Sequence, residues 1–183
     1  MIHVVFNRPS GKMKVFADDG SLWDSFDAGG DAWGDPNYGF EGPMPPGHFI
    51  LGASQRFAPI ASEGIGQIPV SDMNDVTRAA LIKDGKATAG TASIVTIGQL
   101  SLPTGQLSAF NRSAVMLHGG GSNLAGLNPP QNPLAPFQQL CKTEGCTRLH
   151  NADWARLADF IDGHIGVNTV VYSAVGHPLS LAL

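Results

Sequence analysis

Short apolar runs separated by turn residues dominate the beginning of the chain. Residues 2–7, 12–17 and 21–28 are rich in Val, Phe and other strand-forming residues, and the segments RPSG and DDG lie between them. Runs of this kind, bounded by Gly, Pro and Asp, are typical of antiparallel strands joined by tight turns. The pattern therefore predicts a three-stranded meander.

Further segments predict more strands and one long loop. Residues 29–47 are crowded with Gly, Pro, Asp and Asn, the composition of an ordered loop, and they lead into an apolar run at 48–52. Additional strands are expected at 91–100, 113–119 and 166–175. A long loop within a compact domain often carries function, so residues 29–47 are of interest for that reason as well.

Two segments have the pattern of an amphipathic helix. Residues 71–85 begin with Ser71 and Asp72, and both residue types are favoured at an N-cap. Residues 151–164 begin with Asn151, which is expected to be the cap of a second helix. The apolar positions of this second segment recur at helical spacing and comprise Trp154, Leu157, Ala158 and Ile161.

Together these elements predict a mainly β fold with a few helices, a β-rich α+β arrangement in which the sheet is mixed and mostly antiparallel. No internal repeat or linker divides the chain, so residues 1–183 are expected to form a single domain. A hydrophobic content of 43% at this length supports a substantial core without the help of disulfides or metal.

Charge and hydropathy argue against several classes of function. Asp, Glu, Lys and Arg make up 14% of the residues, and the formal net charge of −4 comes without a basic run, so a nucleic-acid backbone is not expected as a ligand. No apolar run reaches the ~18 residues that suggest a membrane span. The N-terminal sequence MIHVVFNRPSGKMKVF lacks the cationic and apolar regions of a signal peptide. We therefore expect a soluble chain without an export signal.

Both cysteines lie in the segment CKTEGCTRLH, residues 141–150. A cysteine nucleophile needs a base, a group that orients the base, and backbone donors for the oxyanion. His118 ends an apolar run and precedes three glycines, which allow a substrate to approach the backbone closely. Gly145 lets the chain turn sharply and expose the sulfur of Cys146. Arg148 can bind a substrate carboxylate through two parallel hydrogen bonds.

The combination of HGG at 118–120 and TEGCTR at 143–148 resembles the catalytic signature of the YkuD-like L,D-transpeptidases, in which His-x-Gly is followed by Ser/Thr-His-Gly-Cys-x-Arg/Asn. The segment GPMPPGHFIL at 42–51 is similar to a strand start found in that family. The opening strands are similar to those of a compact subgroup without signal peptides, delivered as antibacterial type VI secretion effectors. The resemblance implies the L,D-transpeptidase fold, with no cofactor and no metal.

The resemblance also implies a role for each matching position. Cys146 would be the nucleophile and His118 the base, and the backbone carbonyl of Gly119 would orient the imidazole. Gly145 and Cys146 would supply the oxyanion geometry. The positions implied on the substrate side are Thr143, as a hydroxyl that fixes the loop, together with Glu144, Arg148 and Gly120.

Two departures from the family pattern affect these expectations. Glu144 stands where the family has a histidine, which changes the surroundings of the thiol. The separation of His118 and Cys146, 28 positions, is longer than usual, so residues 122–142 are expected to form an enlarged loop or lid.

The implied reaction is peptidoglycan modification. The Cys146 thiolate would attack the carbonyl of the diamino acid at the third position of a tetrapeptide stem, releasing D-alanine and forming a thioester. An amine acceptor would then give a 3,3 cross-link or D-amino-acid exchange, and water would give L,D-carboxypeptidase activity. The implied partners are peptidoglycan stem peptides and, for a secreted effector, an immunity protein. The implied place of action is the bacterial periplasm and cell wall, reached either through a secretion system or by means of a leader that has been removed from this sequence.

Other interpretations of the single residues stay open. Cys146 can be a small buried hydrophobic residue, and His118 can be a strand-end histidine with satisfied hydrogen bonds. Arg148 can be a surface charge or a partner of Glu144 or Asp153. The proline-rich GPMPPG segment can be a rigid turn that sets the following strand.

The cysteines also allow a metal site or a disulfide. A zinc site would use Cys141, Cys146 and His150, although their spacing departs from the usual close pairs. His118 would be the fourth ligand. A disulfide between the cysteines would close a very small loop and gain little from chain entropy. The alternatives for the whole chain are a catalytically silent peptidoglycan-binding domain, favoured by the residue at position 144, and a zinc-stabilised interaction module.

Overall fold

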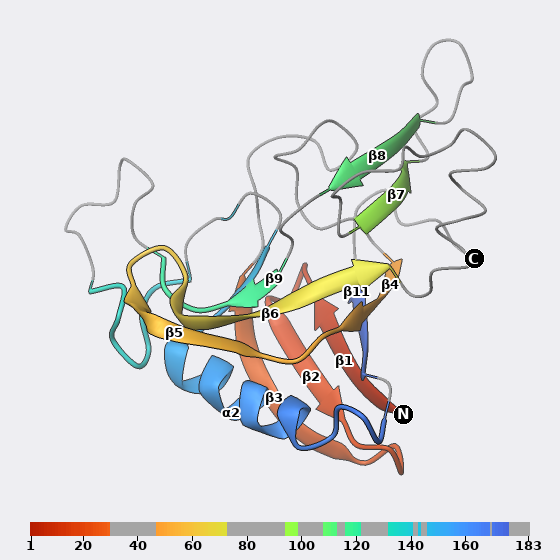
Figure 1. Ribbon diagram of the computed structural model, residues 1–183, viewed down its shortest axis with the longest axis horizontal. Coiled ribbons are helices and arrows are strands. Elements are labelled where there is room, and N and C mark those ends of the chain that lie inside the picture. Colours follow the sequence, from red (N-terminus) through yellow and green to blue (C-terminus); the bar gives the residue numbers. More distant parts are fainter. Residues whose placement is uncertain are drawn as a thin grey trace.

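The computed structural model describes residues 1–29, 47–72, 94–98, 108–112, 116–121, 132–140, 143, 146–168 and 170–175. In these segments the chain is mainly β, with one helix, as Figure 1 shows. The mainly β class predicted from the sequence is confirmed.

The strands are β1 (Ile2–Asn7), β2 (Lys12–Phe16), β3 (Leu22–Gly29), β4 (Gly47–Leu51), β5 (Gln55–Ile60), β6 (Gly64–Asp72), β7 (Ile94–Gly98), β8 (Ser108–Arg112), β9 (Met116–His118), β10 (Thr147–Leu149) and β11 (Val170–Val175). The helix is α2 (Asn151–Asp162). The predicted meander is confirmed, because β1 pairs with β2 and β2 with β3, both antiparallel.

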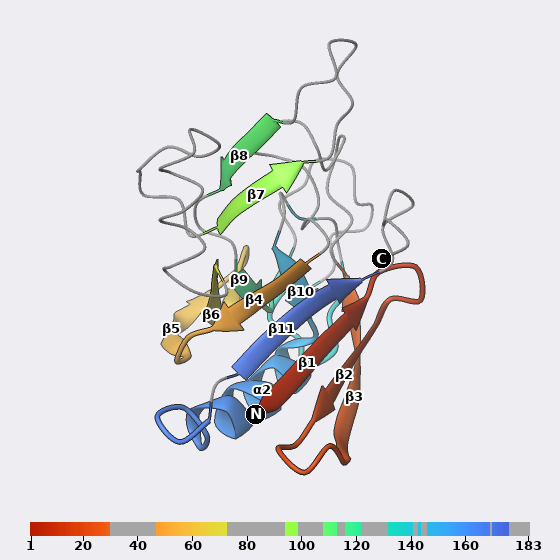
Figure 2. The same cartoon turned by 90° about the vertical axis from the view of Figure 1, so that its right-hand side faces the viewer.

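Nine strands form one sheet in the order β4-β11-β1-β2-β3-β10-β9-β6-β5, and β4 also pairs with β6. Since β4 has β11 on one side and β6 on the other, the sheet closes on itself. Among the described ladders only β1–β11 and β9–β10 are parallel, so the expected antiparallel majority is confirmed. Strands β7 and β8 form a separate two-stranded sheet, which lies beyond the end of the main sheet in Figures 1 and 2.

One hydrophobic core lies within the closed sheet. In β1 the buried side chains of Ile2, Val4 and Phe6 alternate with the exposed His3 and Asn7, the period-two pattern of a strand with one buried face. Burial of each such large apolar side chain contributes about 1.5–3 kcal/mol. The helix adds its apolar side to the same core through Trp154, Leu157, Ala158 and Ile161.

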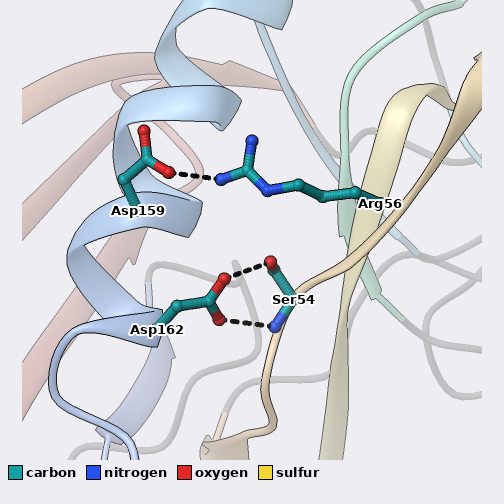
Figure 3. Close-up of polar contacts among 4 residues, drawn as sticks. All are labelled: Ser54, Arg56, Asp159 and Asp162. Atoms are coloured by element: carbon teal, nitrogen blue, oxygen red, sulfur yellow. Dashed lines mark hydrogen bonds and ion pairs between the residues drawn. The ribbon is translucent and has the colours of Figure 1, made fainter.

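Polar contacts on the surface join α2 to the beginning of β5. Ser54 donates its N–H to Asp162 at 2.8 Å and its hydroxyl to the same carboxylate at 2.5 Å. Arg56 forms an ion pair with Asp159 at 2.5 Å (Figure 3). The guanidinium of Arg56 also lies over the ring of Trp154, 5.6 Å from its centroid. We call the four residues Ser54, Arg56, Asp159 and Asp162 the β5–α2 tie.

Two details of the helix predictions are wrong. Ser71 and Asp72 end strand β6, where they pair with Ile50 and Phe49 of β4, and this pairing outweighs the N-cap preference of the two residue types. The rest of that predicted helix lies outside the described residues. Asn151 is the first residue of α2 and not its cap; the cap position is His150, without a side-chain cap hydrogen bond.

The sequence analysis did not predict strands β5, β6, β8 and β10. In β6, glycines and a proline interrupt the apolar pattern, and β10 is three residues long, too short to show a period. Within the described part of the chain, no helix has the length and apolarity that crossing a membrane requires.

Candidate functional site

The candidate site forms where β9 and β10 run side by side in parallel. Their register pairs Leu117 with Thr147 and His118 with Arg148. Leu117 and Thr147 are buried in the core, and alternation along each strand turns His118 and Arg148 to the opposite face. Cys146 immediately precedes β10 and is two positions from Arg148, the spacing of residues on one face.

Neighbouring strands extend this row of residues. His118 pairs with Gln67 on β6, and Arg148 pairs with Gly29 on β3. Segments far apart in the sequence therefore meet at one level of the closed sheet. The register of β9 and β10 places His118 next to Arg148. Their spacing along the sequence does not predict this.

His118 is held in one orientation by the backbone. Its side chain is 4% exposed, and Nδ1 lies 2.7 Å from the carbonyl oxygen of Gly119. A carbonyl only accepts, so in this contact Nδ1 carries the proton, and in the neutral ring Nε2 keeps its lone pair. This is the contact that the family resemblance implied for Gly119. Its catalytic meaning stays a prediction.

The surroundings of His118 keep the imidazole neutral. Burial lowers the pKa of His118 to about 4, the positive charge of Arg148 acts in the same direction, and the hydrogen bond to Gly119 opposes them. At neutral pH the ring is therefore uncharged, with Nε2 able to accept a proton.

Arg148 is buried beside His118, with 6% of its surface exposed, so its interpretation as a surface charge is wrong. Its Nη2 donates to the carbonyl of Ser62 at 3.4 Å. The guanidinium lies against Gly121, which has φ of +120°, and a Cβ at Gly121 would be 2.5 Å from Nη1. The positive φ favours glycine at this position, and any side chain here would also have to displace the guanidinium of Arg148.

Residues 119–121, which we call the glycine strip, are fixed by hydrogen bonds from three directions. Gly120 donates its N–H to Oδ1 of Asn151 at 2.8 Å, and its carbonyl accepts from Nε2 of Gln138 at 3.0 Å. Gly121 donates to the carbonyl of Ala61 at 2.7 Å. The strip that follows His118 is thus anchored to α2, to the segment before β10 and to the β5–β6 turn.

Residues 132–140 hold the glycine strip in place through Gln138 and Asn151. The amide Nδ2 of Asn151 donates to the carbonyls of Pro133 and Ala135, at 2.9 and 2.8 Å. Gln138 accepts the N–H of Asn151 at 2.8 Å through Oε1. This segment belongs to the loop expected at 122–142, and its described part is fastened to the site; the remainder lies outside the described residues.

The same segment presents apolar surface. Leu134 is 42% exposed and Phe137 is 70% exposed. The ring of Phe137 meets the ring of His150 edge-on, with centroids 5.6 Å apart, and Nδ1 of His150 lies 2.8 Å from the carbonyl of Gln138. The segment therefore combines a buried polar side with an apolar outer side.

Cys146 is half-buried. The hydroxyl of Thr143, which is buried, donates to the carbonyl of Cys146, so Thr143 fixes the backbone at that residue. On the next residue, the hydroxyl of Thr147 meets the hydroxyl of Tyr172 at 2.7 Å within the core. These two contacts fix the chain at Cys146 and at the residue that follows it.

Of the residues singled out in the sequence, the structure pairs His118 with Arg148 across β9 and β10 and hydrogen-bonds His118 to Gly119, which Gly120 follows. Thr143 is hydrogen-bonded to Cys146, which directly precedes β10. Glu144 and Gly145 lie outside the described residues. Cys141 does too, and among the described residues no three His, Cys, Asp or Glu side chains could hold a metal ion together.

Sequence reasoning missed four residues of the site: Ser62, Gly121, Gln138 and Asn151. Gly121 belongs to the visible run of three glycines, which was a usable signal. Asn151 was interpreted as a helix cap, since Asn at a helix start favours that role. Ser62 and Gln138 act through contacts that only the folded chain reveals.

No protein-family model and no curated protein matches this sequence. The fold is similar to that of Pgp2, described as a helical cell shape determining protein of Campylobacter jejuni, with a TM-score of 0.54 and 14% identity over 94% of this chain and 46% of that chain. It is also similar to that of Bdellovibrio bacteriovorus Bd1075, with a TM-score of 0.54 and 15% identity over 96% of this chain and 48% of that chain. This chain therefore spans less than half the length of either protein.

A third structure, Mycobacterium tuberculosis L,D-transpeptidase 1, overlaps with a TM-score of 0.42 at 15% identity, over 96% of this chain and 61% of that chain. This overlap is too loose to support a shared fold. The superpositions on Pgp2 and Bd1075 show that this chain has the fold of those two proteins.

Proposed function

We propose that this chain is a peptidoglycan-modifying cysteine enzyme with the L,D-transpeptidase fold, acting as an L,D-transpeptidase or L,D-carboxypeptidase on tetrapeptide stems. The observation that carries the proposal is the parallel register of β9 and β10, which pairs His118 with Arg148, together with the position of Cys146 directly before β10. The shared fold with a protein described as determining cell shape supports action on the cell wall.

In the first half of the reaction, Nε2 of the neutral His118 takes the thiol proton as the sulfur of Cys146 attacks the carbonyl of the third residue of the stem. The C–S bond forms and the carbonyl electrons move to oxygen. When the tetrahedral intermediate collapses, the C–N bond to D-alanine breaks, and the imidazolium returns the proton to the leaving amine. The product is a thioester on Cys146.

The low pKa of His118 defines how the base works. An imidazole with a pKa of about 4 does not hold a proton at neutral pH, so we expect general-base catalysis during attack and not a preformed imidazolium–thiolate pair. The imidazolium formed in the reaction is more acidic than an ordinary imidazolium, which favours transfer of its proton to the leaving amine. Water or an amine acceptor then resolves the thioester by the reverse sequence.

Arg148 has two roles in this proposal. Its charge, buried beside His118, holds a carboxylate of the stem, and its guanidinium also keeps Ser62 and Gly121 in place. Lysine lacks the planar fork, so Arg148→Lys is expected to recover only part of the activity that Arg148→Ala loses.

Cell wall peptides as substrates imply that the protein acts in the bacterial periplasm. Delivery through a secretion system, as an antibacterial effector countered by an immunity protein, belongs to the same proposal and rests on the similarity of the opening strands to that subgroup. Growth of a Gram-negative bacterium with the protein directed to its periplasm tests this part: lysis that requires Cys146 supports it, and normal growth contradicts it.

Mass spectrometry of muropeptides tests the proposed activity. Tetrapeptide muropeptides are incubated with the wild type, with Cys146→Ala and, as a matched control, with Cys141→Ser. Loss of D-alanine, its exchange or 3,3 cross-linking is expected with the wild type and the control, and not with Cys146→Ala. Unchanged muropeptides with all three proteins would contradict the proposal.

One observation favours a second candidate, a peptidoglycan-binding domain without activity. His118 is only 4% exposed, so little of the imidazole can be reached from solvent. Binding of muropeptides by wild type and Cys146→Ala with equal affinity, and without any product, would identify this second function.

A further inference from the structure

The peptide unit between Gly119 and Gly120 is bound at both of its polar ends by side chains. Its carbonyl oxygen, on Gly119, accepts from Nδ1 of His118 at 2.7 Å. Its N–H, on Gly120, donates to Oδ1 of Asn151 at 2.8 Å. Because the peptide unit is planar, a side chain that fixes the direction of the N–H also fixes the direction of the C=O. Asn151 therefore acts on the acceptor of His118 through this peptide.

Asn151 is itself held in a single orientation. Its side chain is buried, and its Nδ2 uses both hydrogens, on the carbonyls of Pro133 and Ala135. An amide nitrogen donates and an amide oxygen accepts, so these two contacts leave Oδ1 directed at the N–H of Gly120. The orientation of the amide is thus determined by its partners on both sides.

The space around Oδ1 is closed by two glycines. A Cβ at Gly119 would lie 2.1 Å from Oδ1 of Asn151, and a Cβ at Gly64 would lie 2.3 Å from the same atom. These distances are far below van der Waals contact, so neither position accommodates a side chain while Asn151 stays in place. Packing and hydrogen bonding thus both fix Oδ1 against the peptide that follows His118.

We infer that Asn151 is a positioning residue for His118: it orients the Gly119–Gly120 peptide so that the Gly119 carbonyl holds the imidazole in the Nδ1–H tautomer and leaves Nε2 as the base. A hydrogen bond to the N–H of a peptide also polarises its C=O, which strengthens the bond that His118 donates. The catalytic meaning of this role rests on the proposed cysteine chemistry, whereas the tautomer of His118 does not depend on it.

The tautomer is measured directly by the ¹⁵N chemical shifts of the His118 ring near pH 7. Three proteins are compared: wild type, Asn151→Ala, which removes the acceptor, and Asn151→Asp, which keeps an oxygen opposite Gly120 but replaces the Nδ2 donor. The wild type and Asn151→Asp are expected to show one Nδ1–H tautomer, and Asn151→Ala a mixture of the two tautomers. Thermal unfolding of each protein records the loss of the contacts to Pro133 and Ala135, which both variants share.

Activity on a tetrapeptide muropeptide gives the second readout. Asn151→Ala is expected to lower kcat by about 10–100-fold, a fraction of what a positioned base contributes, with KM unchanged within about twofold. Asn151→Asp is expected to recover most of kcat even if its Tm is as low as that of Asn151→Ala. If Asn151→Ala does not fold, Asn151→Ser takes its place, because the shorter hydroxyl side chain does not reach the N–H of Gly120.

The outcomes separate this inference from the proposed function. Wild-type ring shifts for His118 in a folded Asn151→Ala or Asn151→Ser variant would overturn the positioning role. So would equal loss of the single tautomer in Asn151→Ala and Asn151→Asp, since the role would then belong to the support of residues 132–140. Absence of turnover in the wild type would overturn the proposed function and leave the tautomer comparison intact.

Discussion

Two regions of this protein join distant parts of the chain through polar contacts of similar length, and they differ in their access to water. In the β5–α2 tie, the side chains of Arg56 and Asp159 are 46% and 76% exposed. The second region is the part of the site formed by His118, the glycine strip, Arg148 and Asn151, which we call the seam. Its three larger residues, His118, Arg148 and Asn151, are 4–6% exposed. Water can replace a lost partner in the tie but not in the seam. Contact distance alone is therefore a poor guide to what a contact contributes.

The seam is most sensitive at Gly120. This residue has φ of +68°, and a Cβ there would lie 2.4 Å from the backbone nitrogen of Gly64. Gly120→Ala is expected to lower the free energy of unfolding by about 2–5 kcal/mol, from left-handed backbone strain of about 1–2 and overpacking of about 1–3 kcal/mol. Urea unfolding followed by circular dichroism measures the change.

Gly20→Ala is the matched control for that experiment. Gly20 has φ of +82°, and a Cβ there would meet nothing within 4 Å. Its substitution is expected to cost only the backbone strain, about 1–2 kcal/mol. Equal losses in the two variants would mean that the strip is not tightly packed against the β5–β6 turn.

Acid is expected to weaken the seam through His118. The pKa of this residue is lowered by burial from 6.5 to about 4, so the folded state favours the neutral ring. The stability from this group is complete above pH 6.5 and is lost as the pH falls from 6.5 to about 4, because over that range the unfolded chain binds a proton that the folded chain does not. At about 1.4 kcal/mol per pH unit, the total loss is about 3 kcal/mol.

His118→Gln isolates this contribution, since glutamine does not titrate. Unfolding free energies at a series of pH values between 7 and 4 are compared for the wild type, His118→Gln and the exposed-site control His3→Gln. The decrease in the free energy of unfolding between pH 7 and pH 4 is expected to be about 3 kcal/mol smaller in His118→Gln than in the wild type, and unchanged in His3→Gln. The same decrease in the free energy of unfolding in all three proteins would show that His118 is not buried as a neutral ring.

The smallest effect is expected in the tie. Asp159→Asn removes the ion pair with Arg56 shown in Figure 3 and should change the free energy of unfolding by no more than about 0.5–1 kcal/mol, because both groups remain solvated. Denaturant unfolding at low and high salt measures it. A decrease of 2 kcal/mol or more in the free energy of unfolding would mean that the tie contributes as much to stability as the seam, and would contradict the difference drawn between them.

The sequence predicts those strands and helices that have one buried face and one face exposed to water. Strand β1 alternates buried Ile2, Val4 and Phe6 with exposed residues, and the apolar face of α2 recurs at helical spacing. Strand β10 has no such pattern because all three of its residues are buried, one in the core as a polar threonine and one on the site face as an arginine. Buried polar residues on both faces of β10 thus remove the alternation of apolar and polar residues that would reveal the strand.

The sequence shows the candidate reacting groups of the site but not the residues that hold them in place. A cysteine after Gly145 and a histidine before three glycines are visible along the chain, and so is an arginine two residues from the cysteine. Asn151 shows why the residues that hold the site in place are hard to predict. Its residue type and its position at a helix start favour a helix cap, whereas in the folded chain its Oδ1 accepts the N–H of Gly120. Such contacts depend on the register of β9 and β10, which local sequence does not specify.

The most direct test of the central claim, that the thiol of Cys146 is the nucleophile, is the mass of the intact protein after brief reaction with a tetrapeptide stem and acid quenching. The wild type is expected to gain the mass of the tripeptide acyl group, carried by the peptide that contains Cys146 and removed by hydroxylamine, as for a thioester. Cys146→Ala is expected to remain unmodified. A wild-type protein that binds the stem and shows no adduct, or an adduct that persists in Cys146→Ala, would contradict the claim.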